Sequence, residues 1–288
     1  MPTQLTVCVM NKAFLLLSLL GSVLARGQTY NGFVLDVETH LPIPFVNIGI
    51  VNRNVGTVSS ENGAFEIRLD AKYDTDSLRF SSIGYASHTF LTRDFKHRFS
   101  SGDGTISLIP KPITLQDVVI TAESKKAFAL GHPPRSRFTK VGLYYNRLGH
   151  EIGTLFESKN SFPSYLDSVQ LNFVNCNYDS IFLRLNVYSV DGDRVENILP
   201  QSVFINLTKK EALANPVINL TPYDLLVGKK YLVSIEIVKD LGELGLKFYA
   251  TLKVDKFPTL YRGTSQDKWE TAYHKSKPYG ISIMTYSH

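Results

Sequence analysis

Five short segments between residues 32 and 85 decide the fold of the first third of the chain. They read GFVLD (32–36), PIPFVNI (42–48), GT (56–57), ENGAFEI (61–67) and SIGY (82–85). Apolar residues alternate with polar ones inside the longer segments, and turn-forming residues separate the segments at close spacing. This pattern is typical of short strands joined by tight turns, so it predicts a small antiparallel β-sandwich.

The glycines and prolines of this stretch indicate turns and sheet edges. The pair Asn62-Gly63 supplies the positive φ angle of a tight turn, so we expect a hairpin there. Pro42 and Pro44 cannot complete a hydrogen-bonded ladder, so the strand that they enter is expected at the edge of its sheet. The remaining strands of this module are expected at residues 77–83, 86–91 and 105–109.

The motifs GxVxD, PxPxVxI, ENGxF and IGY occur here in one order and at one spacing, and together they resemble the carboxypeptidase-regulatory-like domain. We assign this resemblance to residues 29–112. It implies a transthyretin-like β-sandwich, a module common in secreted and envelope proteins of the Bacteroidetes. Such a domain is not itself catalytic and usually serves as a folding or interaction module.

The segment LQDVVITA (115–122) extends the resemblance, because a similar segment follows this domain in many TonB-dependent outer-membrane receptors. The rest of the chain departs from those receptors, since it has neither the length of a plug nor the many strands of a transmembrane barrel. The segment is otherwise a last strand or a docking strand between modules. We assign residues 113–137, which include HPPR (132–135), to a linker.

Residues 1–25 have the features of a signal peptide. They contain no Asp, Glu or Arg, and Lys12 precedes the apolar run at 13–21, which ends near small residues at 23–25. The run is too short to span a bilayer comfortably, which disfavours a membrane anchor. We therefore expect an exported protein that is periplasmic, associated with the outer membrane or extracellular.

Charge and cysteine content exclude several classes of protein. The formal charge of +5 comes from scattered Lys and Arg residues, without the concentrated basic surface that a nucleic-acid partner needs. Cys8 lies in the predicted signal peptide, so Cys176 is the one thiol of the mature chain. An internal disulfide and a cysteine metal cluster are thereby excluded, and Cys176 is expected to pack as a small apolar residue.

Residues 138–288 predict a second, larger antiparallel β-sandwich of jelly-roll type. A hairpin is expected from 141–147 and 151–157, and a short helix at 209–214. The other expected strands are 165–174, 181–190, 202–207, 217–220, 230–238, 246–254, 259–263 and 280–286. The whole chain is thus expected to be all-β, with two modules.

No catalytic residue, cofactor site or metal site is predicted. None of the seven histidines has a Glu three residues later, and no GxSxG elbow or phosphate-binding glycine loop occurs. Asp191 and Asp193 flank Gly192 in a turn, where they are expected to be solvated or, alternatively, to bind calcium.

The candidate ligand-binding residues are aromatic: Tyr261, Trp269 and Tyr273, which lie among polar residues near the C-terminus. Exposed Trp and Tyr rings of sandwich modules can stack on sugars. Alternatively, Trp269 seals the end of the sandwich, because Trp is highly buried on average.

The sequence therefore predicts a non-catalytic binding or structural protein of the cell envelope. Its expected partners are an envelope glycan or an outer-membrane protein complex. One alternative is a carbohydrate-binding module that uses the C-terminal aromatic residues. A second is a hydrolase whose acids, such as Asp167, Glu236 and Asp255, converge in the second sandwich.

Overall fold

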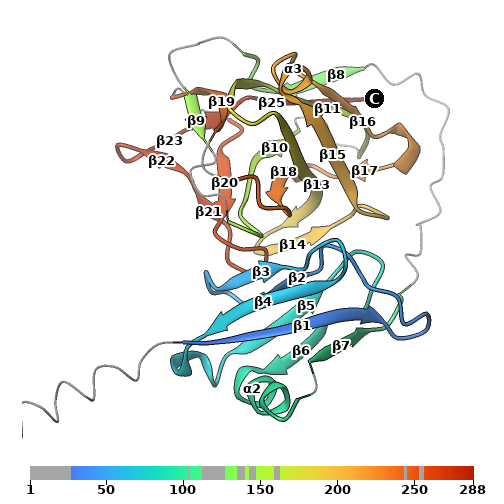
Figure 1. Cartoon of the computed structure of the whole chain (residues 1–288). Coiled ribbons are helices and arrows are strands. Elements are labelled where there is room, and N and C mark those ends of the chain that lie inside the picture. The colour runs from blue at the N-terminus through green and yellow to red at the C-terminus, as the bar shows by residue number, and fades with distance from the viewer. Residues whose placement is uncertain are drawn as a thin grey trace, which may run out of the picture.

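The computed structural model describes residues 27–102, 104–111, 127–134, 140–142, 147–158, 163–242, 245–252 and 256–288. These residues are mostly β and form several sheets around two large hydrophobic cores (Figure 1). The predicted signal peptide, the segment 115–122 and much of the predicted linker lie outside this part of the chain. No helix in the described part is long and apolar enough to cross a membrane.

Two sheets form the N-terminal module. One has the order β4 (Ala64–Leu69), β1 (Gln28–Asp36), β7 (Thr105–Leu108), in which β1 is antiparallel to β4 and parallel to β7. The other has the antiparallel order β3 (Gly56–Val58), β2 (Asn47–Ile50), β5 (Ser77–Ser81), β6 (His88–Leu91). Apolar residues from both sheets share one core, including Val34, Ile48, Ile67 and Phe80. Both sheets of the N-terminal module therefore pack on one core, and one pair of their strands is parallel.

This module also contains a helix that the sequence analysis did not predict, α2 (Thr92–Ser100), besides the short 3-10 helix η1 (Ala71–Tyr73). Phe95 and Phe99 lie one turn apart on α2, and their rings stack with centroids 4.1 Å apart. Phe95 is fully buried in the core of the module. This pair gives an otherwise polar helix of nine residues an apolar face that packs on the core.

The turn at Asn62-Gly63 has the predicted backbone but a different role. Gly63 has a φ of +75°, and a Cβ there would lie 2.7 Å from the carbonyl oxygen of Val34, so glycine is required. The turn joins β3 to β4, which belong to different sheets. The hairpin expected here is wrong, because the chain crosses from one layer of the sandwich to the other.

Hydrogen bonds to Asp36 join two of the sequence motifs of this module. The Tyr85 hydroxyl donates to Asp36 Oδ2 at 3.0 Å, while the backbone N–H groups of Glu38 and Thr39 donate to Oδ1. These bonds, above all the one from Thr39, hold the pKa of Asp36 below its usual value. The GxVxD and IGY segments are thus joined directly to each other.

The C-terminal part contains a curled sheet shaped like half a barrel (Figure 1). Its largest sheet has the order β14 (Arg194–Asn197), β13 (Ser180–Asp191), β18 (Lys230–Ile237), β10 (Glu151–Glu157), β20 (Thr259–Arg262), β21 (Glu270–Thr271), and β15 (Val203–Thr208) also pairs with β13. Neighbouring strands of this sheet are antiparallel.

Two more antiparallel sheets close the core of this part. One has the order β16 (Val217–Asn219), β11 (Ser164–Leu171), β25 (Ile283–Ser287), β8 (Phe128–Gly131), with β17 (Leu226–Val227) also on β11. The other has β12 (Phe173–Cys176), β19 (Leu246–Thr251) and β24 (Gly280–Ile281), with β9 (Lys140–Gly142) on β19. A small ribbon, β22 (Tyr273–His274) and β23 (Lys277–Pro278), lies apart from them. The short elements are α3 (Lys209–Ala212) and the 3-10 helix η2 (Thr221–Tyr223).

Two details of this part differ from the expected arrangement. β9 pairs with β19, and β10 lies between β18 and β20, so the two strands do not form the expected hairpin. β8 lies within the predicted linker but pairs with β25 of the C-terminal part. The short helix at α3 is confirmed, and Thr208 begins it with a capping box to Glu211.

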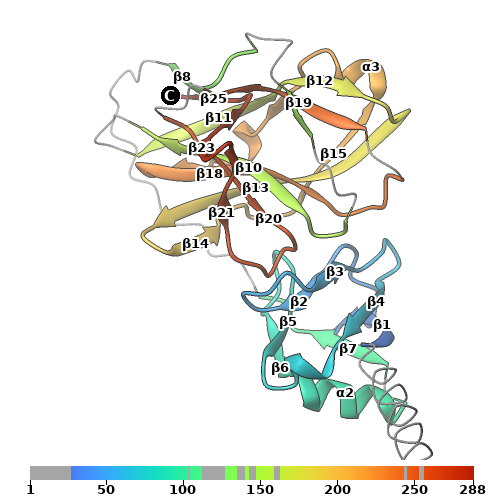
Figure 2. The same cartoon turned by 90° about the vertical axis from the view of Figure 1, so that its left-hand side faces the viewer.

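The two modules meet at the β2–β3 end of the N-terminal sandwich (Figures 1 and 2). The backbone N–H of Asn52 donates to the carbonyl of Gln266 at 2.9 Å, and Arg147 Nη1 donates to Asn54 Oδ1 at 2.8 Å. A separate apolar cluster of Phe45, Val58 and Val238 includes residues of both modules. Polar and apolar contacts together fix the modules against each other.

Candidate functional site: a cleft between the two modules

Two buried glutamates lie side by side in the largest sheet of the C-terminal part. Glu151 on β10 is directly opposite Glu236 on β18, so both side chains lie on the same face of the sheet. Both are completely buried. Asn186 Nδ2 on β13 donates to each of them at 2.9 Å. Like charges opposite each other destabilise a sheet unless other groups neutralise them.

Arg262 neutralises Glu151. Arg262 Nε donates to Glu151 Oε2 at 2.7 Å, while Oε1 accepts from Tyr188 at 2.9 Å and from Ser234. Burial raises the pKa of Glu151, but Arg262 and the hydrogen bonds outweigh burial, so the pKa lies below its usual value. Glu151 is therefore ionised, and both of its carboxylate oxygens accept hydrogen bonds.

Arg184 pairs with the second glutamate. Its Nε and Nη2 lie 3.0 Å and 2.9 Å from Glu236 Oε2. Burial raises the pKa of Glu236, and the nearby charge of Glu151 adds to this effect, while Arg184 opposes it. Glu236 Oε1 has no hydrogen-bond partner within the described part of the chain. Of the two carboxylates, Glu236 is thus the one that more readily takes up a proton.

Arg184 also reaches the N-terminal module. Its Nη1 donates to the carbonyl oxygen of Phe45 at 2.8 Å, and its Nη2 donates to Asn47 Oδ1. Only 2% of the Arg184 side chain is exposed. One buried guanidinium therefore binds a carboxylate of one module and two acceptors of the other.

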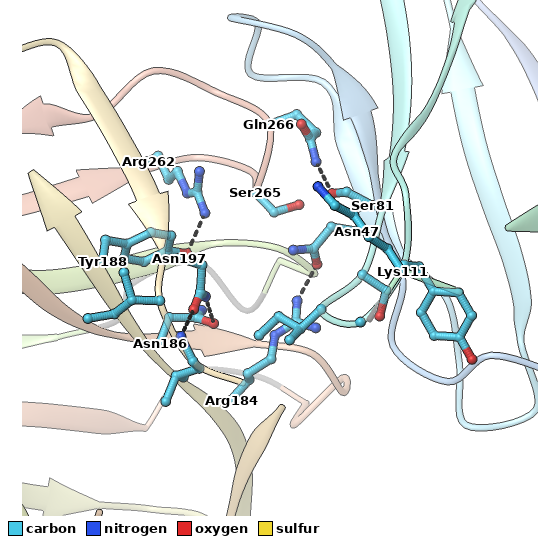
Figure 3. A pocket seen from close by; sticks show the side chains of 16 residues that line it. Asn47, Ser81, Lys111, Arg184, Asn186, Tyr188, Asn197, Arg262, Ser265 and Gln266 are labelled. Atoms are coloured by element: carbon cyan, nitrogen blue, oxygen red, sulfur yellow. Dashed lines mark hydrogen bonds between the residues drawn. The ribbon is translucent and has the colours of Figure 1, made fainter. Parts of the chain in front are cut away.

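Above this network lies a cleft of about 600 Å³ between the modules (Figure 3). Asn47, Ser81 and Lys111 line it from the N-terminal side, and Arg184, Arg262 and Ser265 are among the residues that line it from the C-terminal side. The tips of Asn186 and Tyr188 reach its floor from β13 (Figure 3). Gln266 Nε2 donates to Ser81 Oγ at 2.8 Å and so joins the two walls.

The three predicted aromatic residues take different environments. Trp269 is half-buried, with the Arg262 guanidinium 4.6 Å from its ring centroid and Tyr188 edge-on to it at 5.7 Å. Tyr261 packs against the main core, and its hydroxyl donates to Glu270 at 2.7 Å. Tyr273 on β22 is 62% exposed. The structure thus places Trp269 beside the buried network, and Tyr261 and Tyr273 in separate surroundings; their ligand-binding role stays a prediction.

The acids named in the sequence analysis are dispersed. Asp167 lies 2.7 Å from His288 Nδ1 on the surface, and Asp255 lies outside the described residues. Asp191 and Asp193 are exposed at the β13–β14 turn. The described residues contain no group of three or more His, Cys, Asp or Glu side chains able to hold a metal ion. Among the described residues, no such group therefore supports the alternative that Asp191 and Asp193 bind calcium.

Sequence reasoning missed the network of Glu151, Arg184 and Arg262 and named Glu236 only as one of several acids. One signal was present: Arg184 and Glu236 interrupt the apolar strands IFLRLNV (181–187) and YLVSIEIV (231–238). Charged residues are almost never fully buried unless they are paired, so these two interruptions indicate partners for each other. Glu151 follows His150 near a turn and carries no such signal.

The comparison with known families agrees with the N-terminal module. Residues 30–120 match the model of the CarboxypepD_reg-like domain. The chain therefore contains such a domain, and the rest of the chain is unassigned. No curated protein sequence matches the chain.

Proposed function

We propose that this protein with a CarboxypepD_reg-like domain is an exported, non-catalytic binding protein of the cell envelope, which takes its ligand in the cleft between the modules. The observation that carries the proposal is Arg184, which bonds both modules from beneath the cleft. Because the modules are held in place before any ligand arrives, little binding free energy is spent on ordering the site.

The environment of the two glutamates favours binding over hydrolysis. A general acid or base has to come within hydrogen-bond reach of its substrate. Glu151 and Glu236 are both fully buried, each is paired with an arginine, and neither lines the cleft. Their contacts support a structural role, in which two ion pairs hold β10, β13, β18 and β20 together.

The envelope setting rests on the signal-peptide pattern of residues 1–25 and on the usual surroundings of this kind of domain. The finer fold assignment, a transthyretin-like sandwich followed by a jelly roll, also stays a prediction. We expect an envelope glycan or an outer-membrane protein complex as the partner. The predicted export is tested by fractionating cells that express the full chain and detecting the cleaved mature form. A full-length product in the cytoplasm contradicts the prediction.

Affinity electrophoresis in gels that contain polysaccharides tests the binding function. The blocking variant is Ser82→Trp, which fills the cleft, and its control is Ser100→Trp at the exposed end of α2. We expect retention of the wild type and the control, and loss of retention in Ser82→Trp. Equal retention of Ser82→Trp contradicts a cleft site. Loss of retention in Tyr273→Ala alone favours the aromatic carbohydrate-binding alternative, because Tyr273 is the most exposed of the three rings.

A further inference from the structure

The walls of the cleft carry positive side chains and no acidic ones. Lys111, Arg184 and Arg262 line it, and no Asp or Glu is among its lining residues. The carboxylates that pair with the two arginines lie behind them, away from the cleft. Lys111 is exposed and has no ion-pair partner in the described part of the chain. Because both arginines are ion-paired with buried glutamates, Lys111 is the cation of this cleft that a ligand meets without a paired carboxylate among the described residues.

A buried hydroxyl in the wall of the cleft has no hydrogen-bond partner among the described residues. Ser265 is 4% exposed, and its Oγ makes no hydrogen bond to any described residue. Figure 3 shows this hydroxyl directed into the cleft between Arg262 and Asn47. An unsatisfied buried hydroxyl costs free energy unless a ligand or water supplies the missing bond. Ser265 is thus placed to bind a polar group of a ligand.

Two amides complete a set of donors and acceptors. Asn47 Oδ1 accepts from Arg184, which leaves Nδ2 pointing into the cleft (Figure 3). Gln266 Nε2 donates to Ser81, which leaves Oε1 for a ligand. A fixed donor, a fixed acceptor and a hydroxyl that can act as either suit a molecule that itself carries several hydroxyl groups.

We infer that the cleft binds a carboxylated saccharide, in which the ring hydroxyls bond to Asn47, Ser265 and Gln266 and the carboxylate faces Lys111. This inference rests on the proposed function and names the ligand class of the same cleft. The amide and hydroxyl groups of the walls favour a sugar over an acidic peptide, because acidic peptides are typically recognised by clusters of arginines and both arginines of this cleft are already paired with glutamates. Binding of an acidic peptide is therefore a separate outcome of the test.

The test is isothermal titration calorimetry of the mature chain with three probes: an oligogalacturonate, the same oligosaccharide as its methyl ester, and an oligoglutamate. We expect the oligogalacturonate to bind, the methyl ester to bind about tenfold more weakly, and the oligoglutamate to give no signal. Lys111→Glu should lower the affinity for the oligogalacturonate about five- to tenfold, which is roughly 1–1.4 kcal/mol. Added salt should weaken wild-type binding more than binding to Lys111→Glu.

Two further variants separate binding from stability. Ser265→Ala should weaken binding about threefold or more while leaving the melting temperature unchanged or higher, because it removes a buried hydroxyl that has no partner in the described part of the chain. Lys210→Glu makes the same charge change at an exposed position of α3, and it should leave binding unchanged.

If the acid and the methyl ester bind with equal affinity, and Ser82→Trp still blocks binding, the proposed role of the ligand's carboxylate is wrong. The cleft then remains a binding site. If only the oligoglutamate binds, the inference that the ligand is a saccharide is wrong. A response to Lys210→Glu as large as that to Lys111→Glu overturns the role of Lys111. No binding of the oligogalacturonate, in a preparation that is retained by another polysaccharide, overturns the inference and leaves the proposed function standing.

Discussion

The guanidinium of Arg184 donates a 2.8 Å hydrogen bond to the carbonyl oxygen of Phe45, which lies 139 residues earlier in the chain. The same guanidinium is ion-paired with Glu236 inside the C-terminal sheet. The two modules are therefore joined through a buried charge as well as through apolar contact. A cleft between modules held in this way is formed in advance of its ligand.

Arg184→Met should destabilise the protein by about 3–5 kcal/mol, because it leaves Glu236 as a buried charge without its partner. Urea unfolding at pH 7 measures the change. The double variant Arg184→Met/Glu236→Gln should recover at least half of the loss. Burial raises the pKa of Glu236, so protonation relieves its charge in the fold as the pH falls, and the loss in the single variant should shrink toward pH 4. Equal stability of the single and double variants contradicts the ion pair.

Tyr231 should make the fold sensitive to high pH. Burial raises its pKa to about 12, against about 10 in an unfolded chain. The neutral phenol is favoured in the fold, so this contribution to stability is complete below pH 10 and is lost as the pH rises toward 12. At pH 11.5 the loss is about 2 kcal/mol relative to pH 9. The difference in unfolding free energy between wild type and Tyr231→Phe should fall by this amount, and a constant difference across that range contradicts the assignment.

Cys176 should be unreactive in the folded protein. Its side chain is 1% exposed and packs in the main core of the C-terminal part, and its Sγ lies 3.5 Å from the carbonyl oxygen of Tyr178. A thiol reagent such as dithionitrobenzoate should label it only after unfolding, because reaction requires an accessible thiolate. Labelling of the native mature chain at the rate seen in urea would show that this core is open.

Phe45→Ala should loosen the contact between the modules. The Phe45 ring is buried and lies 5.3 Å from Phe182 and 5.0 Å from Phe204 of the C-terminal part. We expect a loss of about 3–5 kcal/mol, as for other buried Phe-to-Ala changes. Calorimetry should show the thermal transitions of the two modules separating in this variant. Leu41→Ala is the control, since Leu41 is 64% exposed and should cost little.

The strands could be predicted from sequence largely because their alternation is local. Phe65, Ile67 and Leu69 are buried on β4 as their spacing indicates, and β13 and β18 fall within two residues of the predicted ranges. Helix α2 was missed because its only apolar residues are two phenylalanines one turn apart in a polar segment. Two apolar residues in a segment of this length do not distinguish a helix from a loop.

The site could not be predicted in the same way. Glu151 and Arg262 form an ion pair across 111 residues, and their contact depends on the register of β10 against β20. That register is set by the packing of the whole sheet and has no local sequence signal. The sequence analysis did not single out Arg262, although its side chain contacts Trp269 and Glu151.

Hydrogen–deuterium exchange of the mature chain, with and without the oligosaccharide that binds it most tightly, tests the central claim most directly. The cleft is flanked by loop residues 82–86 of one module and 263–267 of the other. We predict that saturating ligand slows exchange in both loops together, because one ligand then contacts both walls. Protection confined to the region of exposed Tyr273, or in one module alone, would contradict a binding site formed between the two modules.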